Sequence, residues 1–369
     1  MSPNARRDSV SRVSTLRVTA ERLVVHRHPR TDTLEVAQIG LYRSVVEAGA
    51  FRTGDVAVYL PEGSVLPREL IAELGLADKL AGPNHDRVKA VLLHGELSQG
   101  IVCRPSSLSN VDLAAAAADG RDLAGQLGVT KWVPPIPPHL TGTLRPAPDL
   151  LPLPEIENIR RYPDLFWPGE RVVVTEKVHG TACLLSHLTA TNEVLVSSKR
   201  YGARRTAIRP TESNLYWRAI RSFEVAEFAA DLAKGFRATR VGIFGEVYGR
   251  GIQDLCYGTD ATERPGYALF DIAVEVAGGV RWLDPADIVT ICDGRLPTVP
   301  VLFEGAYDAD HVMALAEGTE AVSGLTVHLR EGVVVRPAIG RFSTLTSGRA
   351  IGKLLSAAYL TRRDGTEYE

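Results

Sequence analysis

Short runs of apolar residues, separated by turn residues, fill the first part of the chain. Between Leu16 and Pro105 these runs are LRVTAERLVVHRH, TLEVAQIG, GDVAVYLPEG and VKAVLLHGELSQGIVCRP. Alternation of apolar and polar residues between turn residues is typical of β-strands. Closely spaced short strands predict a small β-barrel over 15–130.

Two stretches follow with different patterns. The segment VDLAAAAADGRDLAGQLGV, from Val111 to Val129, predicts one or two helices, because alanine is the best helix former and the glycines supply stops. The next stretch is KWVPPIPPHLTGTLRPAPDLLPLP. Proline lacks an amide donor and fixes φ, so this stretch predicts an interdomain linker over 131–154.

From residue 155 onwards, β-like runs alternate with helix-like stretches. The β-like runs are ERVVVTEKV, EVLVSSKR, VGIFGEVYG, YALFDIAVEV and TVHLREGVVVRP, and the longest helix-like stretch is NLYWRAIRSFEVAEFAADLAKGF. This alternation predicts an α+β domain over 155–369. The polar residues 1–14 are predicted to form a flexible tail.

Composition limits the classes of protein. A chain of 369 residues that is 45% hydrophobic has enough apolar material for two cores. Its net charge of -2 means that any phosphate-binding surface must be local. The four cysteines lie far apart without a C-x-x-C pair, which favours a reducing cytoplasm over a zinc site or a disulfide framework. Neither a signal peptide nor a membrane span is predicted.

The first candidate for chemistry is the hexapeptide EKVHGT, in which Lys177 leaves a β-like run directly into a turn with Gly180. A lysine amine in such a place is a nucleophile if nearby cations or desolvation lower its pKa. A surface lysine before a turn is the commoner case. The hexapeptide alone does not decide between them.

Four later features extend the pattern. Glu246 ends an apolar strand in FGE, as an edge residue or a ligand acceptor, and Phe270 in YALFDI either stacks on a purine or fills a core. Glu331 precedes Gly332, and its carboxylate suits a hard divalent cation while the glycine lets the backbone approach closely. Lys353 is a cation able to bind phosphate.

In this order, the five features resemble motifs I, III, IIIa, IV and V of ATP-dependent ligases, over about 156–360. The His-Gly of EKVHGT resembles the RNA ligase 2 branch, since DNA ligases usually have Asp-Gly there. GEVYGRGIQDLCYG and SAAYL resemble bacterial and protist RNA ligases of the Deinococcus/Naegleria type. Those enzymes carry an OB domain before the transferase domain, whereas DNA ligases place it after.

The resemblance implies an N-terminal OB-like β-barrel and then an ATP-grasp-like covalent nucleotidyltransferase domain, with antiparallel sheets and flanking helices. It implies an ATP-dependent RNA ligase that joins 3′-OH and 5′-phosphate ends at nicks in an RNA-containing duplex, through lysine–AMP. ATP and Mg²⁺ or Mn²⁺ are the implied cofactors, and no obligate protein partner is evident. The alternatives are a DNA ligase, a capping guanylyltransferase, and an RNA-binding protein with a decayed transferase domain.

The resemblance also assigns roles to residues. Lys177 is the nucleophile, and a metal ion together with Lys353 would lower its pKa by like-charge repulsion. Glu246 accepts from the ribose hydroxyls and Phe270 stacks on adenine. Glu331 lies near the water shell of the metal.

Other residues receive supporting roles. Asp271 supports the metal region, Glu176 falls at the adenine edge, and Arg200 falls where relatives hold a phosphate-binding arginine. His179 either orients the AMP or the incoming 5′-phosphate, or is a turn residue without a chemical role. Lys199 is interpreted as a solvated surface charge.

Two departures from the motifs leave questions open. Motif V commonly has a second lysine, but Ile351 and Leu355 occupy both possible positions, and Arg349 is the candidate replacement. Upstream, Asn158 stands where relatives place an arginine, for which the candidates are Arg160 and Arg161. In the OB-like domain, four basic residues face either phosphates or solvent: Arg22, His26, Arg27 and Arg30.

Overall fold

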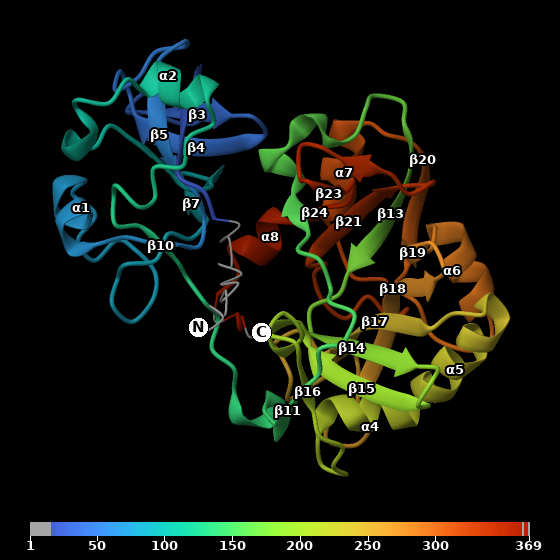
Figure 1. The fold of residues 1–369 in the computed structure, drawn as a ribbon. Coiled ribbons are helices and arrows are strands. Elements are labelled where there is room, and N and C mark those ends of the chain that lie inside the picture. Colours follow the sequence, from blue (N-terminus) through green and yellow to red (C-terminus); the bar gives the residue numbers. More distant parts are fainter. Residues whose placement is uncertain (1–15, 364, 368–369) are drawn as a thin grey trace, which may run out of the picture. The chain divides into compact units, whose positions relative to one another are not determined.

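The computed structural model describes residues 16–363 and 365–367, so the predicted flexible tail over 1–14 lies outside the described residues. The chain divides into two compact units, Met1–Val133 and Pro134–Glu369. Figure 1 shows the strands and helices of each unit. None of the helices in the described ranges is both long and apolar enough to cross a membrane.

Unit 1 consists of short antiparallel strands and two helices. One sheet has the order β1-β5-β9 and is formed by Thr19–Arg22, Val56–Leu60 and Ile101–Cys103. A second has the order β2-β3-β4 and is formed by Val24–Arg27, Leu34–Ile39 and Tyr42–Glu47. Two strand pairs are β6 (Ser64–Val65) with β10 (Thr130–Lys131) and β7 (Val91–Leu93) with β8 (Glu96–Ser98). The helices are α1 (Arg68–Glu73), α2 (Leu113–Ala118) and the 3-10 turn η1 (Ser106–Leu108).

The predicted closed barrel is not found among the described strands of unit 1. Strands β1 and β2 are separated by buried Leu23. Its amide donates to the carbonyl of Asp55 and its carbonyl accepts from the amide of Gly54, both at 2.9 Å, instead of continuing either ladder. The predicted helical stretch over 111–129 forms one helix, α2, which Asp112 caps through the amide of Ala115 at 3.0 Å. Residues 119–129 are mainly turns, because Gly120 adopts a φ of 58° that ends the helix.

Unit 2 is built on two five-stranded sheets. One has the order β12-β24-β21-β13-β20, formed by Glu157–Asn158, Gly352–Leu355, Gly332–Pro337, Arg171–Lys177 and Val301–Ala306. The other has the order β15-β14-β17-β18-β19, formed by Glu193–Ser198, Thr181–Leu188, Arg240–Tyr248, Gly266–Val276 and Gly279–Trp282. All neighbouring strands are antiparallel except β12 and β24.

Helices and short strands complete unit 2. The helices are α3 (Lys199–Gly202), α4 (Leu215–Ser222), α5 (Val225–Phe236), α6 (Pro285–Cys292), α7 (Ala309–Ala316) and α8 (Ala357–Leu360). The short strands are β11 (Leu144–Pro146), β16 (Thr206–Ile208), β22 (Phe342–Ser343) and β23 (Gly348–Arg349). The 3-10 turns are η2 (Pro138–Leu140), η3 (Ile159–Arg161) and η4 (Pro163–Leu165).

Strand alternation gives the second sheet one face for the helices and one for chemistry. Cys183 and Leu185 of β14 belong to the large core that α4 and α5 cover. Leu184 of β14 and Phe244 of β17 belong to a separate cluster. Because successive side chains point to opposite faces, Glu246 lies on the face of Phe244, away from those helices.

Three residues join the two sheets of unit 2. Strand β13 ends at Lys177 and β14 begins at Thr181. Within this connection, a Cβ on Gly180 would collide with the carbonyl oxygen of Val247, so only glycine lets the chain pass so close to β17. The turn that follows Lys177 is therefore fixed by close packing.

The boundary between the two units, after Val133, falls within the predicted linker over 131–154. The first residue of this segment belongs to β10 of unit 1, but from Pro134 onwards the segment is part of unit 2, where β11 pairs with β16. Three leucines between the prolines are buried: Leu140, Leu150 and Leu151. Prolines are tolerated there because β11 is one edge of a two-stranded sheet.

This packing gives a test on stability. We expect Leu150→Ala to lower the free energy of unfolding of the full chain by about 2–5 kcal/mol, since its side chain is fully buried. The control Leu144→Ala, in the same segment but 39% exposed, should change it by less than about 0.5 kcal/mol. Urea unfolding measures both, and equal stabilities would show that the segment is a loose linker.

Candidate functional site

The centre of the candidate site is an ion pair between neighbouring strands of the first sheet. Lys177 is the last residue of β13 and stands opposite Gly332, the first residue of β21. This register brings Nζ of Lys177 to 2.6 Å from Oε1 of Glu331. The Glu331 side chain is only 5% exposed, whereas that of Lys177 is 27% exposed and so remains accessible.

The carboxylates around Lys177 control its protonation. Burial lowers the pKa of Lys177, but the charges of Glu331 and Glu246 outweigh burial and raise the pKa above its ordinary value. The protein's own groups therefore raise this pKa, and the lowering by a metal ion together with Lys353 stays a prediction. The sequence indicated the charge of Lys353 but not the effect of the two carboxylates.

Lys353 completes a group of three amines. Burial and then the charges of Lys199 and Lys177 lower the pKa of Lys353 to about 8. Lys199, at the start of α3, forms an ion pair of 2.8 Å with Glu155. Its charge acts on Lys353 and on Glu246, so Lys199 contributes to the electrostatics of the site, while its interpretation as a solvated surface charge stays a prediction.

Glu246 faces the same group from the second sheet. Its Oε1 accepts a hydrogen bond of 3.1 Å from the amide of Gly180. Burial raises the pKa of Glu246 to about 8, although the charge of Lys177 opposes this rise. Glu246 is thus able to hold a proton near neutral pH, when it can donate as well as accept a hydrogen bond.

Glu176 lies on the other face of β13 from Lys177. Its Oε2 accepts from the amide of Ala321 at 2.7 Å and lies 3.6 Å from Nε of Arg330. Burial raises the pKa of Glu176 to about 7. Its carboxylate is therefore held by the segment before β21, and its predicted place at the adenine edge stays a prediction.

Phe270 occupies a β-bulge. The pairing of β17 with β18 passes from Phe244–Asp271 to Gly245–Leu269, which leaves Phe270 as the extra residue. A bulge turns a side chain away from regular alternation and is often found beside functional sites. Phe270 is partly buried and packs against both the cluster of Phe244 and that of Val178.

Asp271 and Glu331 are not brought together. Asp271 pairs with Arg349 at 2.6 Å and with Arg336 at 3.5 Å. Arg336 lies near the far end of β21 from Glu331, and in the described part of the chain no three metal-ligating side chains gather. Arg349, the candidate second cation of motif V, is engaged by Asp271 and stacks over Trp282.

The remaining candidates are Arg200 and the arginines next to Asn158. Arg200 donates a hydrogen bond of 3.0 Å to the carbonyl of Pro134. Asn158 stands opposite Lys353 in the pairing of β12 with β24, and its side chain accepts from the amide of Arg160 at 2.9 Å. Arg160 and Arg161 form the η3 turn next to β24, and Arg161 lies over the ring of Tyr162.

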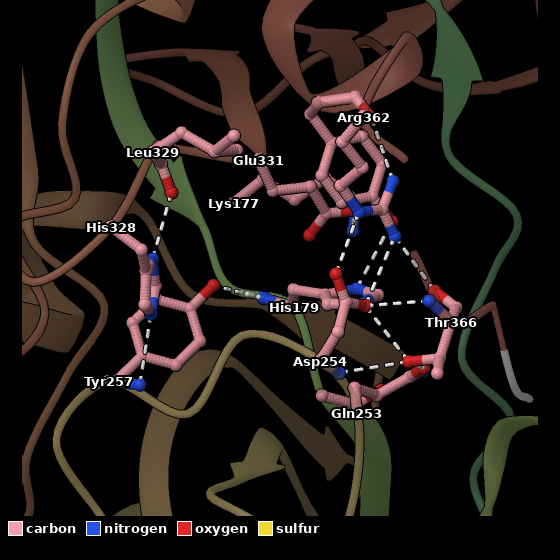
Figure 2. A network of polar contacts seen from close by, with 12 residues as sticks. Lys177, His179, Gln253, Asp254, Tyr257, His328, Leu329, Glu331, Arg362 and Thr366 are labelled. Carbon is pink, nitrogen blue, oxygen red and sulfur yellow. Dashed lines mark hydrogen bonds and ion pairs between the residues drawn. The ribbon is translucent and has the colours of Figure 1, made fainter. Parts of the chain in front are cut away.

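His179 has a polar partner at each ring nitrogen. Its Nε2 lies 2.9 Å from Oδ1 of Asp254, which Figure 2 shows, and its Nδ1 lies 3.1 Å from the hydroxyl of Tyr359. From the sequence, Asp254 and Tyr359 have no assigned role, although both lie in segments that carried the resemblance, GIQDLCYG and SAAYL. The signal was present, but nothing in the sequence paired these residues with His179.

The site thus combines the partly exposed amine of Lys177, two carboxylates that favour its protonated form, and two further amines. Such an arrangement can attack an electrophile from Lys177 and stabilise negative charge through Lys353 and Lys199. Anionic phosphate groups are the natural partners of clustered amines. Such a site has the groups that nucleotidyl transfer through a lysine requires.

Family models match both units. A model described as RNA ligase matches residues 170–355, just over half of the chain. The chain therefore belongs to the RNA ligase family. A model described as an OB-fold domain matches residues 14–105, so an OB-fold domain precedes a nucleotidyltransferase domain of the RNA ligase family.

Solved structures share this fold. A mutant of Naegleria gruberi RNA ligase with ATP and Mn has a TM-score of 0.74 and 21% identity, covering 93% of this chain and 98% of that chain. The same ligase with PPi gives 0.72 and 22%, covering 94% and 96%. A further mutant with AMP and Mn gives 0.73 and 20%, covering 93% and 97%. No curated protein matches the chain, yet the resemblance inferred from the motif order is confirmed.

The Lys177–Glu331 pair gives a test by titration. Glu331→Gln removes the carboxylate that most raises the pKa of Lys177, so burial gains weight and the pKa should fall. Nitrogen NMR of the lysine side chains, assigned with Lys177→Arg, measures this pKa.

The matched control is Glu304→Gln, because Glu304 pairs with Arg171 at the opposite end of β13. This variant should leave the pKa of Lys177 unchanged. An unchanged pKa in Glu331→Gln would show that the ion pair does not govern the protonation of Lys177.

Proposed function

We propose that this RNA ligase joins 3′-OH and 5′-phosphate ends by becoming adenylylated on Lys177, with ATP as the AMP donor. The observation that carries the proposal is the position of the Lys177 amine, 2.6 Å from Glu331 and close enough to Lys353 for its charge to lower the pKa of that lysine. The amine attacks the α-phosphate and pyrophosphate leaves. AMP then passes to the 5′-phosphate end, and the 3′-OH attacks that phosphate and displaces AMP to join the strands.

The amine must lose its proton before it attacks. Glu331 accepts the hydrogen bond of Lys177 and is the nearest base. Glu246, whose pKa is raised to about 8, is a second group near Lys177 that can take up a proton. Lys353 and Lys199 bear positive charge toward the same region, where negative charge develops on the phosphate oxygens. The protein's own groups thus provide both the proton acceptor and the counter-charge.

Glu331 also fits a divalent cation. Its Oε2 is buried and has no hydrogen-bond partner among the residues that the structure describes, so it offers a hard oxygen ligand. Mg²⁺ or Mn²⁺ bound there would supply positive charge to the phosphates and weaken the hold of Glu331 on the Lys177 proton. Naegleria gruberi RNA ligase has been solved with ATP and Mn, which supports this choice.

The remaining roles follow from position. Phe270, freed from the ladder by its bulge, is the proposed platform for adenine, and Glu246 the acceptor for the ribose hydroxyls. Arg200 is proposed to bind phosphate once it exchanges its bond to Pro134 for the substrate. Asp271 is better suited to hold Arg336 and Arg349 than to bind metal.

The OB-fold domain is the proposed contact for the RNA strand. Four basic residues are exposed on and after its first two strands: Arg22, His26, Arg27 and Arg30. Arg22 donates to the carbonyl of Gly54 at 2.8 Å and His26 lies 3.0 Å from Gln38, so both also serve local contacts. Binding of RNA by these four residues is supported by their exposure and charge.

Labelling tests the central proposal. Incubation with α-labelled ATP and Mg²⁺ or Mn²⁺ should give an alkali-stable label that acid and hydroxylamine remove from the wild-type chain, because a lysine phosphoramidate forms. Lys177→Ala should carry no label. Lys234→Ala, which alters an exposed lysine of α5, is the matched control and should be labelled normally.

The nucleic acid is tested separately. We expect nicked duplexes with RNA on the 3′-OH side to be sealed at least about 10-fold faster than duplexes with DNA there, if the enzyme reads the 2′-OH. Single-turnover sealing by enzyme already adenylylated measures this ratio. Equal rates on both duplexes would favour the DNA ligase alternative.

A further inference from the structure

The turn after Lys177 is wrapped by a loop from a distant part of the chain. Gln253 donates a hydrogen bond of 2.9 Å to the carbonyl of Gly180. The hydroxyl of Tyr257 accepts a hydrogen bond of 2.6 Å from the amide of His179. With Asp254 on the imidazole, three residues of one loop hold both the backbone and the side chain of this turn.

The loop is held in turn by the C-terminal segment. Arg362 donates from Nε and Nη2 to the two oxygens of Asp254, at 2.9 and 3.2 Å. Thr366 donates to Oδ1 of Asp254 from its amide at 2.8 Å and from its hydroxyl at 2.9 Å. Figure 2 shows Asp254 between His179 on one side and Arg362 and Thr366 on the other.

The same segment holds the second ring nitrogen of His179. Tyr359 approaches Nδ1 with its hydroxyl, and its ring meets the imidazole edge-on at 5.2 Å. Arg362 lies over the Tyr359 ring at 3.6 Å while it binds Asp254. Arg362 therefore contacts both partners of the imidazole, Asp254 and Tyr359.

The charge state of Asp254 fixes the proton on the imidazole. Although burial favours the neutral acid, hydrogen bonds from His179, Arg362 and Thr366 hold the pKa of Asp254 far below its usual range. An ionised carboxylate only accepts hydrogen bonds, so Nε2 of His179 must carry a proton. In the neutral ring, Nδ1 then accepts from the hydroxyl of Tyr359.

We propose that Asp254 is a positioning residue for AMP transfer, and that Tyr359, Arg362 and Thr366 together form a latch that locks Asp254 and His179 in one orientation. The inference rests on the proposed function, since it concerns the step in which AMP leaves Lys177 for the RNA 5′-phosphate. His179 lies two residues beyond Lys177 in the tight turn, so a shift of its imidazole alters the geometry at the transferred phosphate.

A double-mutant cycle tests this dependence. AMP transfer from pre-adenylylated enzyme to a 5′-phosphate RNA strand is measured under single turnover. Asp254→Ala and His179→Ala should each slow transfer by about 10- to 100-fold. The double variant should be within about 2-fold of His179→Ala, because Asp254 acts only through His179. Losses that multiply in the double variant would overturn the proposal.

Two controls separate positioning from folding. Asp231→Ala, an exposed carboxylate of α5 that pairs with Arg295, should transfer AMP at the wild-type rate. Asp254→Asn keeps the size of the side chain but loses its charge, and it should be as slow as Asp254→Ala. A wild-type rate in Asp254→Asn would overturn the proposal, because the negative charge would then be unnecessary.

A spectroscopic measurement is independent of activity. Imidazole nitrogen NMR of the full chain should show His179 protonated at Nε2, with a hydrogen-bonded proton signal that Asp254→Ala abolishes. This result is expected even if Lys177 takes no label from ATP, so failure of the proposed function and failure of the latch are distinguishable. A His179 signal that Asp254→Ala leaves unchanged would refute the latch.

Discussion

The register between β13 and β21 is the constraint on which the candidate site depends. It sets Lys177 opposite Gly332 and so brings the amine onto Glu331. A Cβ on Gly332 would collide with the carbonyl oxygen of Leu354 in β24, so the glycine keeps three strands close together at this point. A slip of one residue would turn Lys177 to the other face of the sheet, where Glu176 now lies.

Opposite charges held at partial burial give the site its character. The amines of Lys177, Lys199 and Lys353 repel one another, and the carboxylates of Glu246 and Glu331 compensate. None of these groups reaches full hydration, so each responds strongly to a new charge in its surroundings. The protonation of these groups would therefore change when an anionic nucleotide and a cation bind beside them.

The sequence predicted the elements of the site better than their interactions. The order from Lys177 to Lys353 identified the family because each motif is local. The partners of His179 lie 75 and 180 residues away, so no local pattern pairs them with the imidazole. The alternation of apolar and polar residues predicted the strands. The prediction of a closed barrel was wrong, because closure depends on pairing between distant strands. The burial of leucines in the proline-rich segment could not be predicted, because it depends on contacts with distant parts of the chain.

Asp271 has a mechanical consequence beyond its charge. It lies on β18 of one sheet, while its partner Arg336 lies on β21 of the other, and Arg336 also donates to the carbonyl of Phe270 at 3.0 Å. The two sheets are therefore tied here by polar contacts and at Lys177–Thr181 by the chain itself. A hinge motion of one sheet against the other would therefore have to break the contacts of Arg336 with Asp271 and Phe270.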